Sequence, residues 1–264
     1  MNDGIRIGVL LSGGGSNLQA IMAACHRGHI EGQVVFVGSD KPDAHGLTRA
    51  EKKGIPTFIT DYRNVVGSLE PDSLKKHLPD DFDVEHVLAS QQITSETWDK
   101  KKRIAYLSKR AIFEAALLQD MAQYDFDLLV LAGFMRVLSP YFIDRINTVA
   151  DQPRIMNIHP ALLPAFPGVD GYGDTYRYGC KVGGCTVHFV DYGEDTGPII
   201  GQRAFDILPE DTLESVREKG LQLEWELYCD CIALFAQNRV KIAYRECRSR
   251  NGRVYNRKVV EIAA

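Results

Sequence analysis

The stretch "RIGVLLSGGGSNLQAIMAAC", residues 6–25, determines the class of fold that we expect. Residues 6–13 form a continuous apolar run that ends in glycines, which is typical of a buried strand. Leu18, Ile21 and Met22 then recur at helical spacing. A second apolar run, "VVFVGSD", follows this helix at residues 34–40. The chain therefore begins with a predicted β-α-β unit.

The same alternation of strand and helix continues along the chain. "GLTRAEKKG" reads as a helix, "PTFIT" as a strand, "AIFEAALLQDMAQY" as a helix and "FDLLVLAGF" as a buried strand, over residues 46–54, 56–60, 111–124 and 126–134. Strands that alternate with helices favour a parallel sheet covered on both faces. The sequence thus predicts an α/β fold with a mostly parallel sheet.

Two segments depart from this alternation. Residues 62–106 are charged and lack a clear apolar stripe, so we expect a surface insertion there. Near the C-terminus, two β-rich segments flank Asn251-Gly252, a pair typical of a type I′ turn. This indicates a hairpin over about 239–262. Because no linker separates two parts of the chain, we expect a single domain over residues 1–264.

Composition limits the kind of ligand. The chain has 31 Lys and Arg against 35 Asp and Glu among 264 residues, which gives no electrostatic basis for binding nucleic acid or a membrane surface. The chain has neither the pattern of a signal peptide nor a long apolar stretch, so we expect a cytoplasmic protein. The six cysteines form no C-x-x-C pair and no zinc pattern, which indicates reduced thiols and no metal. A small-molecule ligand remains the expectation, and the oligomeric state stays open.

A glycine-rich loop, "SGGGSN" at 12–17, lies between the first predicted strand and helix. Free backbone N–H groups and the helix dipole favour an anion at such a place, although a tight turn would also explain the glycines. The dinucleotide fingerprint requires a glycine where Leu18 stands, and the lysine of a P-loop is missing. Asp40 only imitates the acidic residue of that fingerprint. A single phosphate fits best, held by Gly14, Gly15, Ser16 and Asn17.

The stretch "RIMNIHPALLPAFPG", residues 154–168, places two polar residues in a predicted buried strand. Asn157 and His159 are one residue apart, so their side chains share one face of the strand. A lone histidine before proline is more often a structural residue. Together, however, an amide and an imidazole can donate hydrogen bonds to a developing negative oxygen.

Four segments in order carry a resemblance to a known family: "VLLSGGGSNLQAIM", "LLVLAGFMRVLSP", "IMNIHPALLPAFPG" and "CTVHFVDYGEDTGPIIGQ". They closely resemble the glycinamide ribonucleotide formyltransferases, which are folate-dependent formyltransferases of purine biosynthesis. The match covers about 1–62 and 106–243. It implies a Rossmann-like sheet whose N-terminal half holds the acceptor phosphate, and whose C-terminal half helps to hold 10-formyltetrahydrofolate as co-substrate.

The resemblance also assigns residues. The catalytic trio of the family corresponds to Asn157, His159 and Asp195; the first two would stabilise the oxyanion, while Asp195 would keep His159 charged and position a proton-relaying water. The segment with Met135, Arg136, Val137 and Leu138 corresponds to the wall of the pterin pocket, although it also reads as a strand entering a helix. Two further assignments stay open: His188 either lies in the site or packs behind it, and Glu224, which corresponds to a ribose-binding glutamate, follows about three extra helical residues.

The sequence also departs from the family pattern. In "PGVDGYGD", Asp170 and Tyr172 occupy positions where the family has histidines, so the charge near the cleft differs. We expect Asp170 to point outward or to pair with Arg177 or Lys181. The expected reaction is formyl transfer to the amine of glycinamide ribonucleotide.

Four alternatives remain at this stage: a 10-formyltetrahydrofolate hydrolase, a formyltransferase for another amine, a non-catalytic phosphate-binding module and a nicotinamide oxidoreductase. The phosphate-binding module would leave the trio unexplained. The oxidoreductase would need the missing third glycine of the dinucleotide fingerprint.

Overall fold

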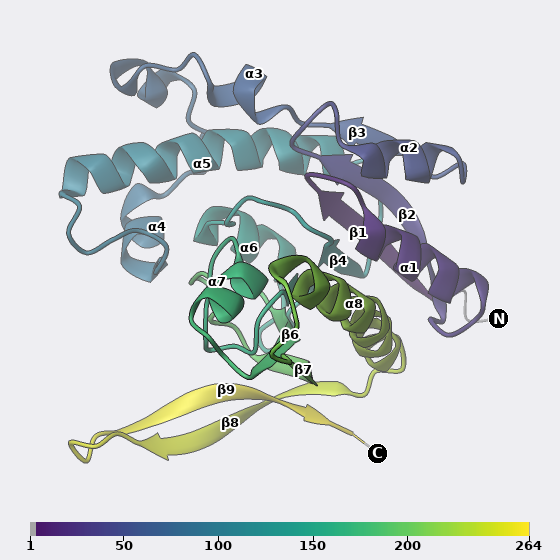
Figure 1. The fold of residues 1–264 in the computed structure, drawn as a ribbon. Coiled ribbons are helices and arrows are strands. Elements are labelled where there is room, and N and C mark those ends of the chain that lie inside the picture. Colours follow the sequence, from purple (N-terminus) through teal and green to yellow (C-terminus); the bar gives the residue numbers. More distant parts are fainter. Residues whose placement is uncertain (1–3, 264) are drawn as a thin grey trace.

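Figure 1 shows the computed structural model, which describes residues 4–263. Residues 1–3 and 264 of the expected domain lie outside the described residues, as do the side chains of residues 71 and 72. The elements follow one another in this order: β1 (Ile5–Leu11), α1 (Ser16–His26), β2 (Gly32–Ser39), α2 (His45–Glu51), β3 (Thr57–Ile59), α3 (Tyr62–Val66), η1 (Pro71–Lys76), α4 (Val84–Ser90), α5 (Lys100–Met121), β4 (Leu128–Leu131), α6 (Pro140–Ile146), β5 (Ile155–His159), α7 (Gly171–Arg177), β6 (Val182–Phe189), β7 (Ile199–Asp206), α8 (Leu213–Ala236), β8 (Val240–Arg248) and β9 (Val254–Ile262).

Seven strands form the main sheet, in the order β3-β2-β1-β4-β5-β6-β7. The pairs from β3 to β5 are parallel, whereas β6 and β7 are antiparallel to their neighbours. Strand order reverses between β1 and β4, since β2 and β3 extend the sheet on one side and β5 on the other. The expected mostly parallel, Rossmann-like α/β sheet is confirmed.

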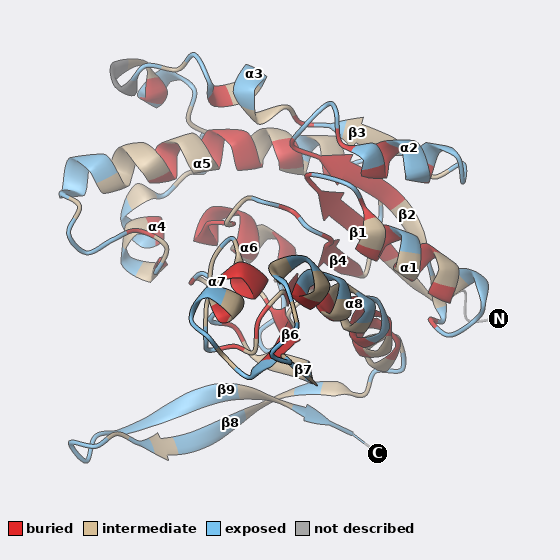
Figure 2. Cartoon of the chain, in the orientation of Figure 1, coloured by how far each residue is buried: buried red, intermediate tan, exposed pale blue. Residues whose placement is uncertain are grey.

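The two faces of the sheet are covered by different helices. Ile7, Val9 and Leu11 of β1 belong to one buried cluster with residues of α1 and α8. Leu10 points to the other face, where it joins residues of α5 and α6. Figure 2 shows the central strands as buried between these layers. The continuous apolar run of β1 follows from this burial on both faces.

The helix expected at 111–124 begins earlier, and this boundary prediction was wrong. α5 spans Lys100–Met121, and the side chain of Asp99 accepts a hydrogen bond from the Lys102 N–H at its start. An aspartate cap satisfies one of the free donors of the first turn. Ahead of α5, the short segments α3, η1 and α4 pack against it. Among the described side chains between α3 and the start of α5, only three apolar ones are buried, which is why no apolar stripe was visible: Val66, Leu74 and Val87.

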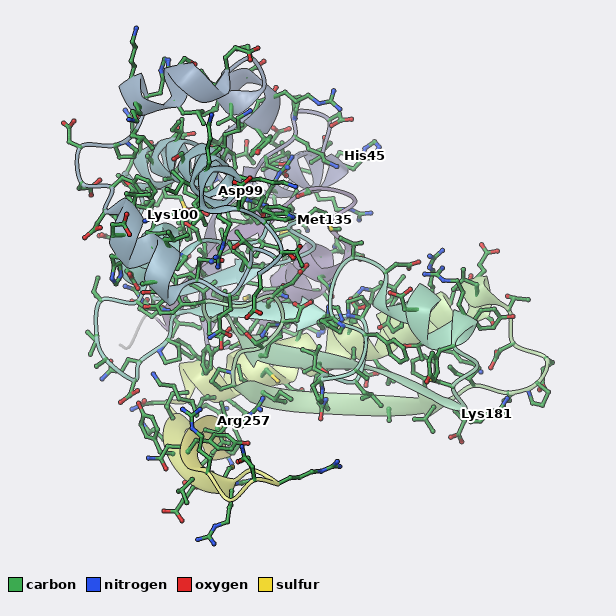
Figure 3. The ribbon with its side chains drawn as sticks, turned by 90° about the vertical axis from the view of Figure 1, so that its left-hand side faces the viewer. His45, Asp99, Lys100, Met135, Lys181 and Arg257 are labelled. Atoms are coloured by element: carbon green, nitrogen blue, oxygen red, sulfur yellow. The ribbon has the colours of Figure 1, made fainter. Side chains whose placement is uncertain are left out.

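The C-terminal hairpin is confirmed, but its predicted turn type was wrong. β8 and β9 pair from Val240↔Ile262 to Arg248↔Val254, and the Ser249 N–H donates to the Arg253 carbonyl. Gly252 has φ 84°, whereas Asn251 is not left-handed. A type I′ turn requires positive φ at both central residues. The loop is instead a three-residue turn that ends in a left-handed glycine. In Figure 3, Arg257 marks this hairpin at the edge of the molecule.

No helix within residues 4–263 is long and apolar enough to cross a membrane. All six cysteines are unpaired thiols. Burial raises the pKa of Cys185 and of Cys231 to about 12, so these two thiols stay protonated at neutral pH.

The hydroxyl of Tyr228 offers a test of how α8 is fixed to the sheet. This side chain is fully buried, and its hydroxyl lies 3.1 Å from the Leu131 carbonyl oxygen and 2.8 Å from that of Met156. Tyr228→Phe removes the shared donor, and we expect the free energy of unfolding in urea to fall by about 1–3 kcal/mol. Tyr178→Phe, at a residue that is 80% exposed, is the control and should change it by less than about 0.5 kcal/mol. Equal stabilities of the two variants would contradict this role of Tyr228.

Candidate active site

A cavity of about 350 Å³ opens at the carboxyl ends of β1, β4 and β5. It lies where the strand order reverses, which is the usual ligand site of open α/β sheets. Every site residue predicted from the sequence lines this cavity: Gly14, Gly15, Ser16, Asn17, Met135, Arg136, Val137, Leu138, Asn157, His159, Asp195 and Glu224. Residues more than two hundred positions apart in the chain are therefore brought to one place.

Asn157, His159 and Asp195 meet at one side of the cavity. The imidazole Nδ1 of His159 lies 3.2 Å from Oδ2 of Asp195, and its Nε2 lies 2.7 Å from the Phe166 carbonyl oxygen. The Gly168 N–H also donates to Oδ2 of Asp195, at 2.9 Å. His159 therefore has an acceptor at each ring nitrogen, which fixes the orientation of the imidazole.

The charges of this pair follow from burial and contacts. Burial lowers the pKa of His159 and outweighs Asp195 and the Phe166 carbonyl, which both raise it. Burial alone would raise the pKa of Asp195, but His188, His159 and the Gly168 N–H together hold it below its ordinary value. Asp195 is thus ionised at neutral pH. We expected Asp195 to keep the His159 ring charged. Asp195 does raise the pKa of His159, but burial lowers it by more, and the depth of burial cannot be deduced from the sequence.

His188 lies next to both Asn157 and Asp195. Its Nε2 lies 3.3 Å from the Asn157 amide nitrogen and 3.6 Å from Oδ1 of Asp195, while its Nδ1 lies 2.9 Å from the Phe189 carbonyl oxygen. The residue is buried and lines the cavity. His188 therefore combines the two interpretations left open above, since it packs within the sheet and also orients Asn157.

The glycine loop faces open space. A Cβ built on Gly13 or Gly14 meets no atom within 4 Å. Gly15 is left-handed, with φ 72°, and a Cβ there would lie 2.7 Å from the Gly46 Cα, so the loop is held against α2. Arg49 of α2 donates to the Gly14 carbonyl at 2.8 Å and adds positive charge that the sequence analysis missed. The arrangement suits an anion at the N-terminus of α1.

Glu224 connects α8 to the glycine loop. Its Oε2 accepts from the Asn17 amide at 2.9 Å, and its Oε1 accepts from the Tyr172 hydroxyl at 2.8 Å. Asn17 keeps a buried Oδ1 without a partner. Despite the additional helical residues that precede it, Glu224 reaches the cavity beside the glycine loop.

The loop after β4 is fixed by a buried network that the sequence analysis missed. The Met135 N–H donates to Oγ of Ser12 at 2.8 Å, and Ser12 donates to Oδ1 of Asp40 at 2.5 Å. Arg136 donates to Oδ2 of Asp40 at 2.6 Å, and its guanidinium lies 3.8 Å from the centre of the Tyr62 ring. Figure 3 marks Met135 on this loop. Arg136 is therefore paired with a carboxylate and is not simply exposed to solvent. The sequence did contain a signal for this network, because a polar residue follows each of two buried strands: Ser12 after β1 and Asp40 after β2.

The charge change at Asp170 is compensated locally. Arg177 and Arg217 each lie 2.9 Å from a different oxygen of Asp170, and they hold the pKa of that carboxyl below its usual value. Of the two expected partners, Arg177 is found, whereas Arg217 takes the place of Lys181. Asp170 does not line the cavity. Within residues 4–263, no group of three or more His, Cys, Asp or Glu side chains could hold a metal ion.

Comparison with known proteins agrees with this geometry. The family model described as "Formyl transferase" matches residues 5–232. Phosphoribosylglycinamide formyltransferase of Bacillus subtilis (strain 168) is 33% identical over 223 residues, which cover 84% of this chain and 90% of that protein. A solved structure of glycinamide ribonucleotide transformylase 1 from Symbiobacterium toebii, 35% identical, matches with a TM-score of 0.70 over 100% of this chain and 96% of that one.

The chain belongs to the formyl transferase family. Within that family it is similar to the phosphoribosylglycinamide formyltransferases, including that of Escherichia coli (strain K12), which is 32% identical over 90% of both chains. The resemblance inferred from the four sequence segments is confirmed.

The titration of His159 tests the charges assigned to the trio. We expect its midpoint, followed by NMR and assigned with His159→Ala, to lie below the ordinary value of 6.5. Asp195→Asn should lower it further because the carboxylate favours the imidazolium, and asparagine tolerates the left-handed backbone at this position, where φ is 55°. Asp191→Asn, in the same loop, is the control and should have a much smaller effect. A midpoint above 6.5 would show that burial is not the dominant effect, and a midpoint that Asp195→Asn leaves unchanged would show that Asp195 does not raise the pKa of His159.

Proposed function

We propose that this protein transfers the formyl group of 10-formyltetrahydrofolate to the amine of glycinamide ribonucleotide in purine biosynthesis. The observation that carries the proposal is that Asn157, His159 and Asp195 line one cavity together with the glycine loop and the loop after β4. The trio can perform the chemistry, and the two loops can hold the two substrates. We further propose small-molecule substrates, no nucleic-acid partner and a location in the cytoplasm.

The reaction begins with attack of the acceptor amine on the formyl carbon, which converts the formyl oxygen into an oxyanion. Asn157 donates an amide N–H to this oxygen, and His159 donates from Nε2 when the oxyanion replaces the Phe166 carbonyl as acceptor. Asp195 accepts from Nδ1 of His159 and so fixes which nitrogen faces the substrate. Because only the imidazolium donates from both ring nitrogens, His159 must be protonated in the adduct, where the oxyanion and Asp195 offset the burial that lowers its pKa. A proton must then pass from the amine to the leaving N10, and ionised Asp195 is the group that positions the relaying water.

The substrates occupy opposite ends of the cavity in this proposal. The acceptor phosphate binds the backbone N–H groups of Gly14, Gly15, Ser16 and Asn17, and Glu224 accepts from the ribose hydroxyls. No acidic side chain lies in the first turn of α1 to repel the phosphate. The pterin lies along residues 135–138, that is, Met135, Arg136, Val137 and Leu138, whose backbone is held in place by Ser12 and Asp40.

The direct test is an assay of purified protein with both substrates. We expect absorbance to report release of tetrahydrofolate, and mass spectrometry to report the formylated ribonucleotide. His159→Ala should lower kcat about a hundredfold or more, as the loss of an oxyanion donor does, while folate affinity changes little. Formate released equally fast with and without the acceptor, and no formylated product, would instead establish the hydrolase.

The glycine loop can be tested separately from the trio. Because a Cβ at Gly14 meets no protein atom, Gly14→Val should leave the fold intact and place methyl groups where the phosphate approaches. We expect the acceptor KM to rise strongly, Gly14→Ala to have an intermediate effect, and the folate KM to stay unchanged. Equal losses for both substrates would indicate a purely structural loop.

A further inference from the structure

Tyr172 is a buried tyrosine, and among residues 4–263 its hydroxyl has one hydrogen-bond partner, Glu224. The residue is 5% exposed, and its hydroxyl donates to Oε1 of Glu224 at 2.8 Å. Tyr172 is not among the residues that line the cavity, whereas Glu224 is. Any effect of Tyr172 on a bound substrate therefore passes through the glutamate.

The helix that carries Glu224 is adapted to this contact. Gly220 lies in the interior of α8, one turn before Glu224, and a Cβ on Gly220 would overlap the Tyr172 ring and its hydroxyl oxygen. A glycine inside a helix costs roughly 1 kcal/mol relative to alanine. The helix thus lacks a side chain at a position where one would overlap the phenol that contacts the carboxylate.

The backbone of Tyr172 is also fixed to α8. Asp170, at the N-terminus of α7, lies 2.9 Å from Arg217, which is on α8 three residues before Gly220. Arg177, at the other end of α7, lies 2.9 Å from the same carboxylate. The two residues that replace family histidines, Asp170 and Tyr172, therefore both tie α7 to α8, on either side of Gly220.

Within the part of the chain that the structure describes, no cation contacts Glu224 to keep it ionised. Burial raises its pKa, and the hydrogen bonds from Asn17 of α1 and Tyr172 of α7 act in the opposite direction. The other titratable groups that face it are Cys185 of β6 and Tyr228 of α8, which are both neutral at physiological pH. Among the described residues, no Lys, Arg or His forms an ion pair with it.

We propose that Tyr172 is a positioning residue, which orients the Glu224 carboxylate toward the ribose of the acceptor and keeps it able to accept hydrogen bonds. An ionised carboxylate has about four lone-pair sites. Asn17 and Tyr172 take one on each oxygen, and one on each remains for two neighbouring hydroxyls. The substrate class selected in this way is a ribonucleotide with a free cis-diol. This inference rests on the proposed function.

Tyr172→Phe tests the inference because it keeps the ring and removes only the hydroxyl. We expect the KM for glycinamide ribonucleotide to rise about tenfold, with kcat within about twofold and the folate KM unchanged. Loss of the hydrogen bond raises the pKa of Glu224, and the protonated carboxyl accepts less well. The acceptor KM of the variant should therefore worsen relative to wild type as the pH falls from about 8 to about 6.

Two matched variants complete the design. Tyr176→Phe lies on the same helix and removes a hydroxyl that donates to the Asp211 carbonyl at 3.2 Å, so its KM values should match wild type. In a Glu224→Gln background, Tyr172→Phe should add little, because the group that it positions no longer titrates.

Three results would overturn the inference while leaving the proposed function standing. They are an unchanged acceptor KM in Tyr172→Phe, a defect of the same size at every pH, and a defect that adds fully to that of Glu224→Gln. Failure of the proposed function is distinct, because wild-type protein would then give no formylated ribonucleotide.

Discussion

A carboxylate that is largely removed from bulk water must have its oxygens satisfied, and Asp195, whose side chain is 11% exposed, is the group on which the rest of the candidate active site depends. One oxygen accepts from the Gly168 N–H and faces His159, and the other faces His188. An unpaired charge at this depth would be strongly unfavourable. Through these contacts Asp195 holds together β5, β6 and the loop after β5. It also explains why the backbone at Asp195 keeps a left-handed conformation that few non-glycine residues adopt.

The strand order of the sheet determines where the cavity beside Asp195 lies. Because β2 and β3 extend from one side of β1 and β4 and β5 from the other, the loops after β1 and β4 diverge and leave a crevice. The loop after β1 is glycine-rich and presents a helix N-terminus, whereas the loop after β4 presents backbone groups that Ser12 and Asp40 hold in place. In the proposed function, an anionic substrate and a flat heterocycle bind beside these two loops, in one cavity that β5 also lines.

Much of the fold could be predicted from the sequence because it depends on patterns of residues that are close together in the chain. The apolar run of β1 and the glycines after it report burial and a tight turn within a few residues of one another, and the order of four segments was sufficient to identify the family. The start of α5 was not predicted, because its cap at Asp99 lies in a charged segment without periodicity. The type of the hairpin turn was missed because Asn251-Gly252 is compatible with more than one loop length.

The site residues also divide into those that a short-range pattern predicts and those that depend on contacts made only in the folded chain. Asn157 and His159 are one residue apart, so their common face could be deduced, whereas the contact of Tyr172 with Glu224 joins residues 52 positions apart and exists only in the folded chain. The direction in which the pKa of His159 shifts could not be predicted either, since the shift is a balance between burial and a carboxylate from another segment.

Gly220 has a consequence for how this site can change by mutation. A side chain at 220 and the ring of Tyr172 exclude each other from the same space. The two positions are therefore epistatic: tyrosine at 172 is accommodated only after 220 has become glycine, and the reverse order passes through an intermediate with a steric clash. Once both are present, position 220 cannot regain a side chain while Tyr172 remains, whereas position 172 can still change, so the pair constrains the later evolution of α8 more than that of α7.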